Sequence, residues 1–187
     1  MSEPMTNQPV NGFLAELASA APAPGGGAVA ALAGALGAAL VSMVANLTVG
    51  KKDYAGVQDQ VQNLLSQAEA LRGKLAAAIE DDYTVFMQLS AAMKLPRATD
   101  EEKAARTAAV QAALKAATDV PMQIAEGCAA VMKLCRPVAE IGNANAVSDA
   151  GVAVLLAEAG LRSAALNVMI NLVRIKDEAF VAEKRGR

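Results

Sequence analysis

Apolar residues recur in this chain at intervals of three and four, which is the spacing of a helix that buries one face. The longest run lies between Tyr54 and Leu95, before Pro96, and it predicts one long helix over this range. Its stripe of apolar positions is Val57, Val61, Leu64, Ala68, Leu71, Leu75, Ala78, Val85, Leu89 and Ala92. Asp82 interrupts the stripe, because a carboxylate occupies a position where the pattern requires an apolar side chain.

The same spacing, together with capping and helix-breaking residues, predicts five more helices. The capping box from Thr99 to Glu102 begins one of them. Prolines and glycines between Ala21 and Gly27 separate the first two, and Pro121 is expected to begin or kink the next helical stretch. The predicted ranges are about residues 8–20, 28–49, 99–118, 121–141 and 148–177.

Composition favours a protein built only from helices. Hydrophobic residues make up 54% of the 187 positions and aromatic residues only 3%. The abundant residue types are helix formers, and no linker or internal repeat divides the chain. The sequence therefore predicts one all-α domain over residues 1–187, an antiparallel bundle of long helices. Its core is expected over about residues 10–180, with flexible ends at 1–7 and 181–187.

The uncharged stretch 28–49 has the length of a membrane-spanning helix. It consists mostly of Ala and Gly and contains Ser42, Asn46 and Thr48, which partition poorly into lipid. We therefore expect this helix to be buried inside a bundle or a dimer, without contact with a membrane. A membrane-inserting hairpin is the alternative, and solubility without detergent would exclude it.

The residue content excludes several kinds of chemistry. The chain has no histidine, so it has no imidazole base, no Ser-His-Asp triad and no His-containing zinc site. Its net charge of -2 gives no reason to expect a nucleic acid partner. Cys128 and Cys135 lie in one predicted helix with Cα atoms about 10 Å apart, too far for a disulfide. We interpret both as core thiols of a cytoplasmic protein, and the polar N-terminus shows no secretory signal.

A cluster of small polar residues lies between the last two predicted helices. Its polar side chains are Asn143, Asn145, Ser148 and Asp149. Such groups at a helix junction either cap the helix or hold a ligand. Steps of three and four from Asp149 lead along the last helix to Asn167, Asn171 and Arg174. That helical face therefore either bonds to another helix or lines a pocket.

Three other features have both a structural and a functional interpretation. Asp82 must be paired, protonated or next to a cavity, because an unpaired buried carboxylate is costly. A salt bridge to a lysine from a neighbouring helix, or local access of solvent to this part of the stripe, would be the structural explanation. Gly25–Gly27 precede a helix N-terminus, where free N–H groups bind an anion or carbonyl, or they form a simple tight loop. Lys51 and Lys52 follow a helix C-terminus, which attracts cations for structural reasons alone.

Taken together, these segments match a known family in order and spacing. The matching segments are Pro24–Gly27, Gly50–Tyr54, Asp82 with Phe86, Leu95–Pro96, Gly142–Val152 and Ala165–Val168. They resemble the cyclodeaminase domain of the formiminotransferase-cyclodeaminase family, which includes free-standing bacterial methenyltetrahydrofolate cyclohydrolases. The resemblance covers about residues 10–180, and its asparagine-rich segment is the most specific part. Many members carry a further C-terminal helix, which is expected to be short or absent here.

The resemblance implies an all-α homodimer that hydrolyses the methenyl bridge of methenyltetrahydrofolate to formyltetrahydrofolate. It also implies a polyglutamylated folate substrate and no metal or other cofactor. Asp82 is then the general base and Asp149 orients the pterin or stabilises charge, although the two could exchange roles. Lys51 returns a proton or binds the glutamate tail. The other residues expected to bind substrate are Gly25, Gly26, Gly27, Lys52, Tyr54, Asn143, Asn145, Ser148 and Asn167.

Two other functions stay open on the sequence alone. A cyclodeaminase acting on formiminotetrahydrofolate would release ammonia while closing the same ring. The bifunctional relatives carry a transferase domain that this sequence lacks, so we expect the cyclohydrolase. A helical dimer that binds folate without turnover belongs to a different class, and only the short C-terminus favours it.

Overall fold

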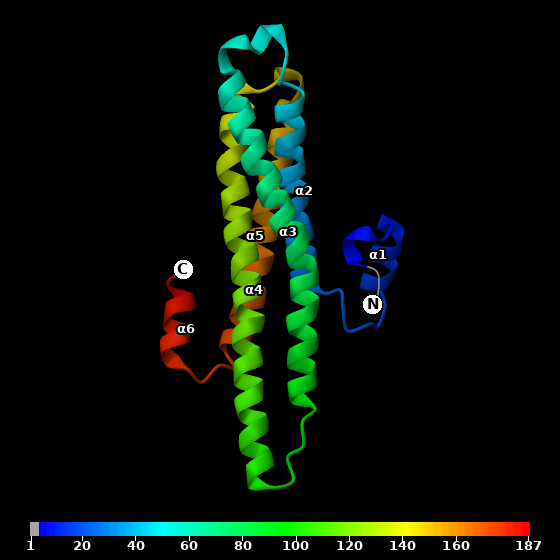
Figure 1. Cartoon of the computed structure of the whole chain (residues 1–187), viewed down its shortest axis with the longest axis vertical. Coiled ribbons are helices and arrows are strands. Elements are labelled where there is room, and N and C mark those ends of the chain that lie inside the picture. Colours follow the sequence, from blue (N-terminus) through cyan, green and yellow to red (C-terminus); the bar gives the residue numbers. More distant parts are fainter. Residues whose placement is uncertain (1–3) are drawn as a thin grey trace.

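A computed structural model describes residues 4–187, and every regular element in this range is a helix. Four long helices lie side by side (Figure 1): α2 (Gly26–Asn46), α3 (Gln58–Met93), α4 (Asp100–Ile141) and α5 (Val147–Leu172). The shorter elements are α1 (Val10–Leu17), α6 (Glu178–Arg185) and the 3₁₀ helices η1 (Met5–Asn7), η2 (Lys52–Val57) and η3 (Ala144–Ala146). The predicted all-α fold is therefore confirmed for the described residues.

Helix α2 lies in the core because its small residues let its neighbours approach closely. It carries no charged side chain over its 21 residues. A Cβ atom at Gly34 would lie 2.5 Å from the sulfur of Cys128, and one at Gly37 would lie 2.9 Å from the backbone oxygen of Ala153. Glycine at these two positions therefore allows α4 and α5 to pack directly on the α2 backbone.

Helix α3 buries the stripe that the sequence pattern predicts, including Val61, Leu75 and Leu89. The helix begins later than expected, because Lys52–Val57 form the 3₁₀ helix η2 and Tyr54 has a non-helical backbone there. Further along the same stripe, Asp82 is half-buried. The exception in the pattern is therefore real, and the protein must accommodate this carboxylate near its core.

The structure corrects the predicted helix boundary between residues 118 and 121, because α4 runs unbroken through Pro121 and Pro137. Pro121 has no N–H to donate to the backbone oxygen of Ala117. The side-chain amide of Asn171, on α5, donates to that oxygen over 2.7 Å. A contact between distant segments thus replaces the missing backbone hydrogen bond, and sequence spacing alone does not reveal it.

The last predicted helix, 148–177, is wrong in its length, since α5 ends at Leu172. Five residues, 173–177, separate it from a further helix, α6. Asp177 is its N-cap, and its carboxylate accepts a hydrogen bond of 3.0 Å from the backbone N–H of Phe180. A local cap therefore restarts the helix in a new direction.

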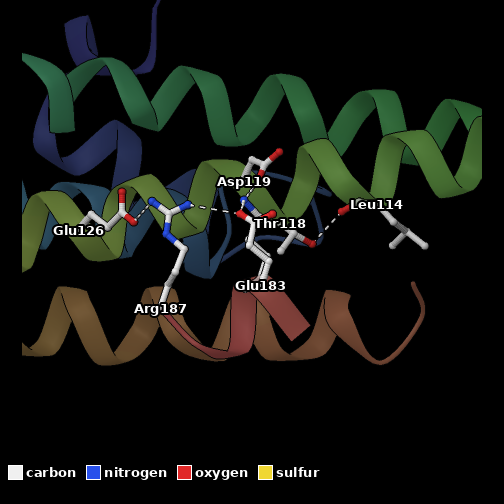
Figure 2. Close-up of polar contacts among 7 residues, drawn as sticks. Leu114, Thr118, Asp119, Glu126, Glu183 and Arg187 are labelled. Carbon is white, nitrogen blue, oxygen red and sulfur yellow. Dashed lines mark hydrogen bonds and ion pairs between the residues drawn. The ribbon is translucent and has the colours of Figure 1, made fainter. Parts of the chain in front are cut away.

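The C-terminal segment also differs from the flexible end that the sequence predicts. Figure 2 shows the Arg187 guanidinium against the Glu126 carboxylate on α4. The Lys184 ammonium lies 2.9 Å from the Asp119 carboxylate, and the Lys184 side chain is only 9% exposed. These ion pairs attach α6 and the residues after it to α4.

Both cysteines are buried and free, as predicted. Burial raises the pKa of the Cys128 thiol and of the Cys135 thiol to about 11. Each thiol is therefore protonated and uncharged at neutral pH, and each packs as a small apolar group.

The neighbouring helices α2 and α5 expose apolar side chains that the described chain leaves uncovered. The larger ones are Val29, Leu36 and Met43 on α2 and Val152, Leu155, Leu166 and Ile170 on α5. Both α2 and the segment Ala144–Leu172 are long and apolar enough to cross a membrane. The most apolar window of α2 is 61% buried, whereas that of Ala144–Leu172 is only 28% buried. Burial in the core thus accounts for most of the apolar character of α2 but not for that of α5.

Candidate active site

A cavity of about 390 Å³ opens where α2 begins, with walls from α3, α4 and α5. Figure 1 shows that α3 and α4 run on past this end of α2. The polar and glycine residues of the lining are Gly25, Gly26, Gly27, Asp82, Ser90, Asn167, Asn171 and Arg174. A few polar groups converging in an otherwise apolar cavity are typical of a small-molecule site. A larger cavity of about 700 Å³ lies between α4, α5 and α6, but none of the predicted site residues lines it.

The Asp82 carboxylate lies directly against the first turn of α2. A Cβ atom at Gly27 would be only 2.0 Å from Asp82 Oδ1. The ion pairs of residues 4–187 do not include Asp82, so the lysine partner considered from the sequence is wrong. Burial raises the pKa of the Asp82 carboxyl above its usual value, and a hydrogen bond from the backbone N–H of Ala28 opposes this in part.

Asp82 caps the N-terminus of α2 and also faces the cavity. Gly25, the N-cap of α2, has no side chain to satisfy the first N–H groups of the helix. The Asp82 carboxylate takes this place from another helix, and it interacts favourably with the positive end of the α2 dipole. Because the same carboxylate also lines the cavity, it can contact a ligand while it caps the helix.

Two asparagine amides on α5, one turn apart, complete the polar lining. The Asn167 side-chain N–H donates to the backbone oxygen of Ser163 over 2.9 Å, and that of Asn171 donates to Ala117. These bonds fix both side chains and leave each amide oxygen and one N–H for other partners. Both amides can therefore bind the donors and acceptors of a heterocyclic ligand.

The other predicted site residues lie at the far end of α2. They are Lys51, Lys52, Tyr54, Asn143, Asn145, Ser148 and Asp149. The Asn143 side chain donates to the backbone oxygen of Leu47 over 3.1 Å and accepts from the backbone N–H of Asn145 over 3.0 Å. The Tyr54 hydroxyl accepts a hydrogen bond of 3.0 Å from the backbone N–H of Ala144. Asn143 therefore attaches η3 to the end of α2, and Tyr54 attaches η3 to η2.

The two groups do not form one site within a single chain. Helix α2 has 21 residues, which corresponds to a length of about 30 Å. The structure gathers Gly25–Gly27, Asp82 and Asn167 around the cavity at one end. It keeps Lys51, Asp149 and their neighbours near the other end, because both groups are attached to the same rigid helix.

The structure adds residues that the sequence analysis did not assign to the site. Asn171 and Arg174 follow Asn167 by four and seven residues, so the polar face of α5 already carried this signal. Ser90 lies two helical turns after Asp82 and lines the same cavity. Nothing in the sequence indicates Pro121 as a lining residue, because its place depends on how α4 and α5 pack.

The Asp82 carboxylate has no ion-pair partner within residues 4–187, so it is suited to a cationic group of a ligand, and the two fixed amides are suited to the polar edges of a ligand. A carboxylate beside a cavity can also accept a proton from water, which is a step that hydrolytic reactions need. The sequence profile of the formiminotransferase-cyclodeaminase family matches residues 9–187. The chain belongs to this family.

Relatives of known name support the family assignment. A methenyltetrahydrofolate cyclohydrolase from Methylorubrum extorquens is 53% identical over 178 residues, covering 95% of this chain and 86% of the relative. The formimidoyltransferase-cyclodeaminase of Sus scrofa is 37% identical, and the match covers 98% of this chain but 34% of that protein. A crystal structure of formiminotetrahydrofolate cyclodeaminase from Thermotoga maritima has a TM-score of 0.85 at 32% identity, with 96% of this chain and 86% of that chain covered.

Proposed function

We propose that the protein hydrolyses the methenyl bridge of methenyltetrahydrofolate to give formyltetrahydrofolate. The observation that carries this proposal is the Asp82 carboxylate, which faces a cavity without an ion-pair partner among residues 4–187. The substrate carries a positive charge spread over the carbon and two nitrogens of its bridge. A half-buried carboxylate beside the cavity would attract such a cation and could activate a water molecule bound next to it. The 53% identical cyclohydrolase supports the same reaction.

The reaction has two steps, and Asp82 acts in the first. Asp82 accepts a proton from a water molecule as the water oxygen bonds to the bridging carbon. This neutralises the cation and gives a tetrahedral intermediate with one hydroxyl. One carbon–nitrogen bond then breaks, the hydroxyl becomes the formyl oxygen, and the departing nitrogen receives a proton. Asn167 would hold the pterin edge, and the N–H groups after Gly25 would face the developing oxygen.

We also propose that the protein acts as a homodimer. The support is the apolar surface of α2 and α5, which the described chain leaves uncovered. Two α5 helices that cross near Ala159 in opposite directions would place the N-terminal end of one beside the C-terminal half of the other. Asp149 and Lys51 of a second copy would then approach the cavity of the first. This arrangement would unite the two residue groups that one chain keeps about 30 Å apart.

In this dimer the remaining predicted residues regain the roles that the family resemblance implies. Asp149 of the second copy would orient the pterin, and Lys51 would return the proton to the departing nitrogen. Lys52, Asn145 and Ser148 would contact the substrate from the same side. We propose a polyglutamylated folate as the substrate, no metal or redox cofactor, and a cytoplasmic location. Turnover that persists after dialysis against a chelator would support the absence of a metal.

Complementation between two inactive variants tests whether each active site contains residues from both copies of the dimer. Asp82→Asn and Asp149→Asn proteins are each expected to be inactive, because every site in either homodimer lacks one carboxylate. Mixed, unfolded and refolded together, they should recover about a quarter of the wild-type activity, since half of the dimers have one intact site of two. A mixture of Asp82→Asn with Asp82→Ala is the control and should stay inactive. Failure of the first mixture to regain activity would contradict a site shared between two copies.

The reaction itself is tested with purified protein and methenyltetrahydrofolate, by following the loss of its near-ultraviolet absorbance. We expect a loss faster than the spontaneous hydrolysis measured without protein. If there is no acceleration, formiminotetrahydrofolate is the next substrate, with ammonia release as the readout, because the solved structural relative is named for that reaction. Binding of either folate without turnover would support the non-catalytic dimer and contradict the proposed hydrolysis.

A further inference from the structure

The cavity contains one acidic and one basic side chain, and they lie at different ends. Asp82 lies at the start of α2. The other charged lining residue is Arg174, and its guanidinium Nη2 lies 3.7 Å from the sulfur of Met93. Asp82 and Met93 both belong to α3, eleven residues apart, which corresponds to about 16 Å along the helix. The cavity is therefore polarised along its length.

The end of the cavity near Met93 carries positive charge that is not paired with an acidic side chain of residues 4–187. A second guanidinium, that of Arg106, donates to the backbone oxygen of Met93 over 3.0 and 3.2 Å. Neither Arg106 nor Arg174 takes part in the ion pairs of residues 4–187. Two arginines beside one residue, without a carboxylate partner in the described chain, make a site that attracts anions.

The backbone that carries Arg174 is held in place. Gln111 on α4 donates its side-chain N–H to the backbone oxygen of Arg174 over 3.0 Å. The side-chain oxygen of Gln111 accepts a hydrogen bond of 2.8 Å from the backbone N–H of Lys176. This pair of bonds fixes the chain just after α5, so the guanidinium reaches the cavity from a defined position.

We propose that Arg174 binds the carboxylates of the substrate's glutamyl tail, with Arg106 beside it for a longer tail; this rests on the proposed function. In a folate the benzoyl ring and the glutamyl amide separate the bridging carbon from the tail carboxylates by on the order of 10–13 Å, from ordinary bond lengths. That span fits between Asp82 and the Met93 end of the cavity. A guanidinium pairs with a carboxylate through two parallel N–H bonds, and arginine is suited to this geometry.

The test compares Arg174→Gln with wild-type protein on three substrates: methenyltetrahydropteroate, which has no glutamate, and the mono- and triglutamates of methenyltetrahydrofolate. We expect Arg174→Gln to raise KM about tenfold for the glutamates, because one charge-assisted hydrogen bond contributes on this scale. It should leave KM for the pteroate and all kcat values unchanged. Arg136→Gln is the matched control, since Arg136 is an exposed arginine paired with Glu140 on α4, and it should resemble wild type.

A fluorescence titration of the same ligands separates this proposal from the hydrolysis itself. If wild-type protein shows no turnover, the proposed reaction fails, but the titration still measures whether glutamate improves binding and whether Arg174→Gln removes that improvement. An equal loss of affinity for the pteroate and the glutamates would overturn the role of Arg174 in tail binding. So would a fall in kcat alone, or an unchanged preference for glutamates in the variant.

Discussion

An Asp82→Asn protein is expected to lose about 10²- to 10⁴-fold in kcat for hydrolysis of methenyltetrahydrofolate, the usual contribution of a general base. Asparagine has nearly the same shape and keeps an oxygen that can accept from the Ala28 N–H. It cannot take a proton from water or balance the charge of the substrate. Steady-state kinetics on the folded variant measures the loss.

The same substitution should not weaken the fold, which separates function from structure. Burial raises the pKa of Asp82 in the folded protein, so the unfolded chain ionises this group more easily. Ionised Asp82 therefore costs stability at neutral pH, and this cost disappears as the pH falls below the usual aspartate range. Asp82→Asn should unfold at the same or a higher denaturant concentration than wild type at neutral pH.

The pH profile gives a second readout. Because the base must be ionised, the wild-type rate should fall as the pH drops through the pKa of Asp82, which lies above the usual value for aspartate. Asp81→Asn is the matched control, since Asp81 is exposed next to Asp82 on the same helix, and it should keep both the rate and the profile. Full activity in a folded Asp82→Asn protein would exclude Asp82 as the base.

Gly27→Ala should remove most of the activity and also destabilise the fold. The new Cβ atom would meet Asp82 Oδ1 at 2.0 Å, so either the carboxylate or the first turn of α2 must move. Overpacking of this kind costs about 1–3 kcal/mol. A displaced base loses its alignment with the substrate, and we expect kcat/KM to fall by about 10²-fold.

Gly73→Ala is the matched control for Gly27→Ala. Gly73 lies inside α3, and a Cβ atom there has no neighbour within 4 Å. Alanine should stabilise this exposed helical position by about 0.5–1 kcal/mol relative to glycine and leave the kinetics unchanged. Denaturant unfolding and steady-state rates measure both variants. A fully active Gly27→Ala protein would show that catalysis does not depend on the position of the Asp82 carboxylate against α2.

Local features predicted several elements correctly. The apolar stripe from Val57 to Ala92 gave the buried face of α3, because helical periodicity depends only on residues three and four apart. The capping box of Thr99 and Glu102 gave the start of α4, since both of its hydrogen bonds lie within one turn. Asp82 was identifiable because it interrupts an otherwise regular pattern.

Features that depend on distant contacts were predicted wrongly or not at all. Pro121 indicates a break by itself, but Asn171 from another helix takes the place of its missing donor. The C-terminal residues look solvated in the sequence, yet Arg187 and Lys184 pair with acidic residues of α4. The hydrogen bonds by which Asn143 joins η3 to the end of α2 and Tyr54 joins η3 to η2 likewise connect residues up to 96 positions apart.

The sequence by itself determined the helical class, the buried stripe of α3 and the single carboxylate that interrupts it, since each follows from short-range spacing and residue type. Only the tertiary structure decided which candidates share a site. It placed Asp82 against Gly27 and Asn167 against Gly26, and it left Lys51 and Asp149 at the other end of α2. The physical reason is that a helix is rigid over its length, so residues become neighbours through packing between helices, which spacing along one chain does not specify.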